Sequence, residues 1–197
     1  MRARATSTLA IAALLAGACA TPSPPAPAVT RTIALKHPGF EDPATTRKCP
    51  VGWDCTMHAD PNSFRFFHDE ATPAAGKASL CIEPVGKEPW GIASQGVFDI
   101  KALYGARVRF SAAIRVEGVI GDGAGPYVMA RGPAYGATLA HDKRLVNGTH
   151  GWQRIFVEIE VPEAAPFIEL GVVLEGRGRV CLDDVILEVV QVPKRPV

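Results

Sequence analysis

Two pairs of neighbouring carboxylates stand near the two ends of the chain, Glu41-Asp42 in "HPGFEDP" and Asp183-Asp184 in "CLDDVIL". A carboxylate beside a proline-glycine turn can stabilise the turn, bind a hard metal ion or act as a catalytic acid. Glycoside hydrolysis needs two carboxylates that face each other across a cleft, and no cleft motif is visible here. The sequence also has no G-x-S-x-G or H-E-x-x-H motif. We therefore predict that the protein is not an enzyme and has no catalytic residues.

The cysteines are the second set of residues with possible chemistry. Apart from Cys19 near the N-terminus, the chain has Cys49, Cys55, Cys81 and Cys181. An even number of cysteines in an exported chain indicates two disulfides, with three pairings open. The simplest interpretation is that Cys49 and Cys55 close a local loop and that Cys81 joins an early strand to Cys181 in the last one. Zinc is a poor alternative, because no C-x-x-C pair or cysteine–histidine cluster is present.

The first thirty residues have the pattern of an export signal. Arginines precede the short apolar run "LAIAALLAGA", as in a secretory signal peptide, which we assign to 1–18. The run ends at Cys19 in a sequence that resembles a lipoprotein signal, and ordinary cleavage at a nearby A-x-A site is the alternative. Residues 19–31 are rich in proline and fit a disordered tether. We expect localisation in the cell envelope, in the periplasm or at the outer membrane, with membrane attachment only through the lipid.

The rest of the chain is the size of one domain, which we place at 32–191 and follow with a C-terminal tail at 192–197. A net charge of +1 gives no indication of a nucleic-acid partner. Short β-rich runs separated by Gly, Pro, Asp and Asn predict an all-β fold, an antiparallel β-sandwich. The predicted strands are 32–36, 63–69, 78–84, 92–100, 106–118, 126–132, 151–162, 167–176 and 178–190.

Alternation of side chains supports this fold class. In 106–118, hydrophobic residues alternate with Arg107, Arg109 and Arg115, which indicates a strand with one buried and one solvated face. The arginines could bind an acidic or hydroxyl-rich ligand, or pair with Glu158 and Glu160 of a neighbouring strand. The glycine-rich stretch "GVIGDGAGP" is expected to be a long loop between strands.

Several motifs, taken in order, resemble those of carbohydrate-binding modules with a galactose-binding-domain-like jelly roll. They are "HPGFED", "PVGW", "GKASLCIEP", "WGIASQGV", "ARVRFSAAIRVEG", "THGWQRIFVEIEVP" and "GRGRVCLDDVIL". The resemblance runs from about Ile33 to Val189, and its two ends are the most specific parts. It implies a jelly-roll sandwich.

The resemblance also implies a structural calcium ion. The positions that match the family's calcium ligands are Glu41, the backbone at Gly76, Lys77 and Ala78, and Asp183, with Asp184 as the alternate carboxylate. Calcium prefers several hard oxygen ligands of this kind. The alternative is that the carboxylates only accept hydrogen bonds from turn amides. The chain departs from the family pattern at His37 and Cys181.

Binding of sugars by such modules uses aromatic faces flanked by polar groups. We expect Trp53 and Trp152 to pack in the core. The ligand-binding candidates are Trp90, Tyr127, Tyr135 and Arg109. Two functions remain open: a monomeric, non-catalytic envelope lipoprotein domain that binds carbohydrate, or a structural β-sandwich domain that binds an envelope protein.

Overall fold

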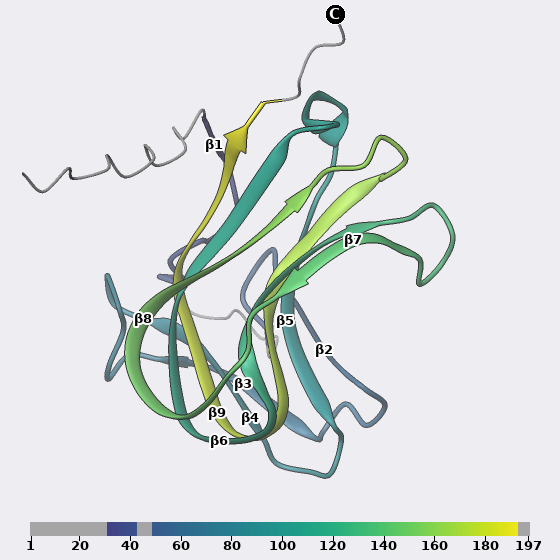
Figure 1. The fold of residues 1–197 in the computed structure, drawn as a ribbon. Helices are drawn as coiled ribbons and strands as arrows, with labels where there is room; N and C mark the ends of the chain where they lie inside the picture. The colour runs from purple at the N-terminus through teal and green to yellow at the C-terminus, as the bar shows by residue number, and fades with distance from the viewer. Residues whose placement is uncertain (1–30, 43–48, 193–197) are drawn as a thin grey trace, which may run out of the picture.

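Antiparallel strands make up most of the computed structural model, which describes residues 31–42 and 49–192 (Figure 1). The predicted signal peptide, Cys19 and nearly all of the tether and the tail lie outside these ranges. Within them, no helix is long and apolar enough to cross a bilayer. The elements in chain order are β1 (Arg31–Ile33), β2 (Asp54–Met57), β3 (Phe64–Asp69), β4 (Ser79–Pro84), β5 (Trp90–Val97), the 3-10 turn η1 (Ile100–Leu103), β6 (Arg107–Arg131), β7 (Thr138–Lys143), β8 (Val146–Glu160) and β9 (Phe167–Gln191).

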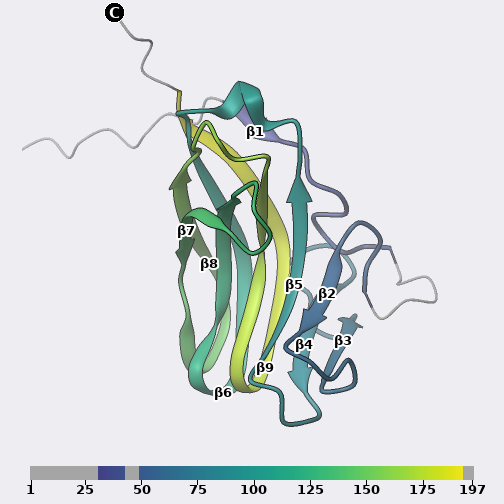
Figure 2. The same cartoon turned by 90° about the vertical axis from the view of Figure 1, so that its right-hand side faces the viewer.

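The two longest strands, β6 and β9, form an antiparallel ribbon that bends in its middle (Figure 1). Each half of the ribbon belongs to a different layer of the sandwich. The first half of β6 pairs with β8, and the second half of β9 pairs with β4 and β1. The second half of β6 pairs with β7, and the first half of β9 pairs with β5, which in turn pairs with β2. We name the two layers by their edge strands. The β3–β8 layer contains the first half of β6 and the second half of β9, and the β2–β7 layer contains the other two halves (Figure 2).

The core lies between the layers and follows the predicted alternation. Val108, Phe110 and Ile114 of β6 are fully buried, as are Leu170 and Leu174 of β9. Because side chains of a strand alternate between its faces, the residues between them point to the outer faces. The predicted all-β antiparallel sandwich is confirmed.

The glycine-rich stretch 118–126 was expected to be a loop, and this prediction is wrong. It belongs to β6 and pairs with β9 through register shifts at the bend. Gly121 and Gly123 have positive φ angles, which side chains with a Cβ rarely adopt. A Cβ at Gly121 would lie 2.9 Å from the Glu175 carbonyl oxygen. Glycine therefore allows both the bend and the close approach, and the predicted strands on either side of it are one strand.

Other strand boundaries also differ from the prediction. β2 and β7 were not predicted, because both are short edge strands with mostly polar sequences, "DCTM" and "TLAHDK". The predicted strand 92–100 starts at Trp90 and stops at Val97, since Asp99 has a left-handed backbone and η1 follows. Strand 32–36 ends at Ile33.

Both predicted disulfides are present. Cys49–Cys55 closes the loop before β2, and Cys81–Cys181 joins directly opposite residues of β4 and β9. Disulfides of this kind are typical of proteins from oxidising compartments.

The chain's opening segment also attaches to β9. Phe40 is fully buried and packs on Trp53, with ring centroids 5.0 Å apart. The carbonyl oxygen of Pro38 accepts a hydrogen bond from the Val185 amide at 2.9 Å. The segment thus closes one side of the sandwich.

Candidate functional site

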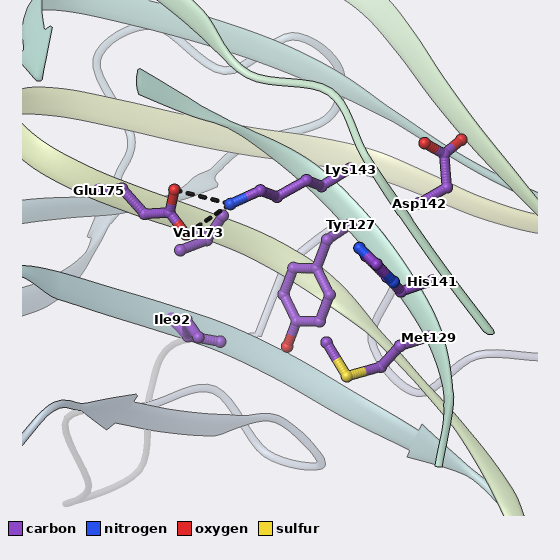
Figure 3. Close-up of a pocket in the computed structure, with 8 residues that line it drawn as sticks. All are labelled: Ile92, Tyr127, Met129, His141, Asp142, Lys143, Val173 and Glu175. Atoms are coloured by element: carbon purple, nitrogen blue, oxygen red, sulfur yellow. Dashed lines mark hydrogen bonds and ion pairs between the residues drawn. The ribbon is translucent and has the colours of Figure 1, made fainter. Parts of the chain in front are cut away.

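The outer face of the β2–β7 layer contains a pocket of about 210 Å³ (Figure 3). We call it the Tyr127 pocket. Outward-facing residues of β5, β6 and β9 form its floor: Ile92, Tyr127, Met129 and Val173. Its rim is formed by β7 and by the end of the first half of β9. The remaining lining residues are His141, Asp142, Lys143 and Glu175.

Tyr127 is held rigidly in this floor. It lies opposite Gly171 of β9. Its hydroxyl donates a hydrogen bond to Glu169 Oε1 at 2.8 Å, and Ser94 also contacts the hydroxyl. Burial, reinforced by the Glu169 carboxylate, raises the pKa of Tyr127 well above its ordinary value. The hydroxyl is therefore a neutral donor, and with the side chain only 3% exposed little of the ring remains for a ligand.

Two ion pairs cross this face. Lys143 Nζ lies 2.8 Å from Glu175 Oε2 (Figure 3), and Arg131 Nε lies 2.7 Å from Glu169 Oε2. Both carboxylates are less than a quarter exposed. They present acceptor oxygens beside apolar side chains, and their charge is balanced by the cations.

Trp90 lies on the same face, at the start of β5 and opposite Glu175. It is half-buried, and His58 of the edge region packs edge-on against its indole at a centroid distance of 5.9 Å. His58 in turn lies 2.7 Å from Glu88. The structure therefore brings the predicted residue Trp90 to the same face as Tyr127.

A second and larger pocket, of about 460 Å³, lies toward the other end of this face. We call it the Phe98 pocket. Tyr135 at the tip of the β6–β7 hairpin lines it and is fully exposed. Phe98 and Phe167 also line it and stack on each other at 5.1 Å. Neither phenylalanine was predicted as a site residue. The sequence could have indicated Phe98, because it continues the series of alternate positions of β5 whose side chains point outward.

Arg109, the fourth predicted ligand residue, lies elsewhere. It is on the outer face of the β3–β8 layer, where its guanidinium contacts Glu158 at 2.6 Å and stacks on Phe156. Arg107 also approaches Glu158, while Arg115 pairs with Asp69. Glu158 thus pairs with arginines as expected, whereas Arg115 pairs with Asp69 rather than with Glu160. Arg109 lies at neither pocket.

Of the tryptophans expected in the core, Trp53 is buried there. Trp152 is half-buried on the outer face of the β3–β8 layer, where its indole N–H donates to the Thr72 carbonyl oxygen at 2.9 Å. It therefore lies outside the core, because its position on β8 points outward and the loop that contains Thr72 covers it.

The predicted calcium ligands meet at the loop between β3 and β4. Asp183 is fully buried, and its Oδ2 accepts hydrogen bonds from the amides of Ala74 and Ala75, each at 2.9 Å. Its Oδ1 accepts from the Asp184 amide at 2.7 Å. Glu41 Oε2 accepts from the Lys77 amide at 2.7 Å.

Among the residues that the structure describes, neither Glu41 nor Asp183 forms an ion pair with a basic side chain. Burial raises the pKa of Asp183, the three amides oppose that rise, and the Glu41 carboxylate adds to it. The Gly76 backbone passes so close that a Cβ there would clash with the Glu41 carboxylate. Asp184 points away and pairs with Arg154.

No protein-family model matches the chain. The chain is similar to the uncharacterized HTH-type transcriptional regulator YbfP of Bacillus subtilis, with 27% identity over 167 residues. This similarity covers 82% of the chain and 56% of the regulator, so the chain spans just over half the length of that relative.

Among solved structures, the fold is similar to the CBM22-1 xylan-binding domain from Paenibacillus barcinonensis, with a TM-score of 0.54, 16% identity, and coverage of 86% of this chain and 99% of that domain. It is also similar to the C-terminal family 22 carbohydrate binding module of Clostridium thermocellum, with a TM-score of 0.52, 14% identity, and coverage of 88% and 100%. A putative sugar binding protein from Bacteroides thetaiotaomicron gives a TM-score of 0.52, 9% identity, and coverage of 81% and 95%. At these identities the similarity establishes the β-sandwich fold.

Proposed function

We propose that the protein is a non-catalytic module that binds carbohydrate through the outer face of the β2–β7 layer. The observation that carries the proposal is the Tyr127 pocket, in which an apolar floor lies directly beside the carboxylate of Glu175, which is paired with Lys143. The similarity of the fold to carbohydrate-binding modules supports it.

The chemistry of this face fits a sugar ring. A pyranose has apolar C–H faces and hydroxyl groups around its edge, so it needs apolar contact flanked by hydrogen-bond acceptors. Ile92, Met129 and the exposed part of Trp90 provide the apolar contact. Glu175 and Glu169 provide acceptors whose orientation is fixed by their ion pairs, which lowers the ordering cost of binding.

We further propose that the module works in the cell envelope after export, anchored through a lipid on Cys19. The two disulfides support export. Mass spectrometry of the mature N-terminus tests the lipid: a diacylated Cys19 is the expected result, and an unmodified terminus at a later residue would refute the anchor.

A structural calcium ion at Glu41 and Asp183 is also part of the proposal. The two carboxylates fit a cation, because they lie close enough for Glu41 to raise the pKa of the buried Asp183 and neither forms an ion pair with a basic side chain in the described ranges. Calcium would supply the missing positive charge there and join the opening segment to β9.

The alternative is a structural domain that binds an envelope protein. The observation that favours it is the burial of Tyr127, because a ring that is only 3% exposed offers almost no stacking surface. This alternative predicts no retention by any glycan.

Affinity electrophoresis in gels that contain xylan, galactan, mixed-linkage glucan or pectin separates the two functions. We expect the mature wild-type protein to be retarded by at least one polysaccharide and Trp90→Ala to lose most of that retardation. Trp152→Phe, on the opposite outer face, is the control and should migrate like wild type. Unretarded wild-type protein in every gel would refute carbohydrate binding.

A further inference from the structure

The Phe98 pocket lies on the same sheet face as the Tyr127 pocket. Phe98 follows β5 at an outward position, and its ring covers Gly96, where a Cβ would lie 2.9 Å from the ring. Gly96 is directly opposite Glu169 of β9. The glycine therefore makes room for an aromatic side chain that lies flat along the face rather than in the core.

The aromatic side chains of this pocket are unusually exposed. Phe98 is 65% exposed although it stacks on Phe167, and Tyr135 is fully exposed at the hairpin tip. Large apolar groups grouped at a pocket and bordered by polar residues are typical of binding sites. A stacked phenylalanine pair with one open face is the surface that a sugar ring covers well.

Glu169 connects the two pockets. It accepts the hydrogen bond of Tyr127, which floors the first pocket, and it pairs with Arg131, which lines the second. Val173 in the first pocket and Phe167 in the second are on the same strand, β9. They are six positions apart along the strand, a distance of about 20 Å. The two pockets are therefore parts of one continuous path along the sheet.

The charges on this path restrict the ligand. Within the described ranges, the lysine and arginine that line the two pockets, Lys143 and Arg131, are each paired with a glutamate of the same face. To gain a cation, an acidic polysaccharide would have to break one of these pairs, which would leave a glutamate carboxylate uncompensated beside the acidic ligand. The charge pattern favours an uncharged ligand.

We propose that the Phe98 pocket is a second sugar-stacking site, which together with the Tyr127 pocket binds one linear, uncharged glycan chain. The inference rests on the proposed function and adds the length and charge of the ligand. The ligand must therefore be a chain of several sugar units, because a single ring cannot span the distance of about 20 Å between the pockets.

Calorimetric titration with oligosaccharides tests this proposal. The probes are the dimer to the hexamer of the neutral polysaccharide that retards the wild-type protein, beginning with xylo-oligosaccharides. We expect wild-type affinity to rise by about tenfold between trimer and hexamer, because the longer chain reaches the second pocket. For Phe98→Ala, hexamer affinity should fall by roughly five- to tenfold and trimer affinity should stay unchanged.

Two further variants make the result specific. Phe98→Tyr keeps the ring and should bind the hexamer as wild type does. Phe156→Ala removes a phenylalanine that is 44% exposed on the opposite outer face and should also leave affinity unchanged. The proposal is overturned if Phe98→Ala binds the hexamer like wild type, or if only the acidic pectin retards the protein. Both outcomes leave carbohydrate binding itself intact, whereas failure of wild type to bind any glycan removes both proposals.

Discussion

Replacing Asp183 with asparagine tests how the opening of the domain is attached to its last strand. The side chain is fully buried and its two oxygens accept three backbone amides. Asparagine keeps one oxygen, so its NH₂ group must face at least one amide donor. Leaving such a donor unsatisfied costs about 1–3 kcal/mol. For a domain of this size the melting temperature should fall by roughly 3–10 °C.

Asp184→Asn is the matched control, with the same change at the adjacent position. The Asp184 side chain is 52% exposed and pairs with Arg154, and exposed ion pairs contribute only about 0.2–1 kcal/mol. Asparagine also tolerates the positive φ of 45° at this position. Both variants are measured by urea unfolding in the presence of a chelator, so that metal does not contribute. Equal losses in the two variants would refute the reasoning.

The pH dependence of the same variant has a defined sign. Burial raises the folded-state pKa of Asp183 above its ordinary value of 3.8. Between pH 3.8 and the raised folded-state pKa, the folded protein binds more protons than the unfolded chain. The contribution of Asp183 to the free energy of unfolding therefore falls as pH rises through this range. Asp183→Asn removes this fall. A variant whose unfolding free energy follows the wild-type pH profile over the same range would contradict the assignment.

Three further predictions concern stability. Millimolar calcium, added to wild-type protein from which a chelator has removed metal, should raise the melting temperature, because a ligand at 100 times Kd adds about 2.7 kcal/mol to the free energy of unfolding. Calcium should not change the melting temperature of Asp183→Asn. If calcium leaves the wild-type melting temperature unchanged, the proposed calcium site is refuted. Replacing both Cys81 and Cys181 with alanine should lower the free energy of unfolding by roughly 4–5 kcal/mol, because this disulfide closes a loop of 100 residues. The same replacement of Cys49 and Cys55 should lower it by only about 2 kcal/mol. Equal losses for the two disulfides, measured by denaturant unfolding, would count against the loop-entropy explanation. Tyr127→Phe should lose about 1–2 kcal/mol with the hydrogen bond to Glu169, and an unchanged urea midpoint would show that the bond adds nothing to stability.

The fold was largely predictable because its signals are local. Alternation in β6, β8 and β9 identifies strands with one buried face, and the spacing of the cysteines leads to the simplest pairing, which the structure has. The bend at 118–126 was missed because a run of glycines is typical of loops, and only the partner strand shows that they remain paired. The sequence of β7 shows no alternation of hydrophobic and polar residues, because an edge strand on a solvated face does not have to bury one of its sides.

The candidate site was only partly predictable. Trp90, Tyr127 and Tyr135 were selected as aromatic residues outside the expected core, and the structure places all three along one sheet face. It also shows that Tyr127 is buried, with its hydroxyl bonded to Glu169 of the neighbouring strand, a contact that becomes apparent only when β6 and β9 are paired. Arg109 was a candidate for its charge, but its position on the first half of β6 assigns it to the other layer. Phe98 and Phe167 are distant in sequence and meet only through strand pairing.

The outer face of the β2–β7 layer is the carbohydrate-binding surface that we propose. Amide chemical-shift mapping by NMR, with xylo-oligosaccharides or the oligosaccharide series of whichever polysaccharide retards the protein, tests it most directly. We expect saturable shifts concentrated on β5, the second half of β6, β7 and the first half of β9, with Trp90 and Val173 among the affected amides. Saturable shifts confined to the β3–β8 layer, around Arg109 and Phe156, would contradict it.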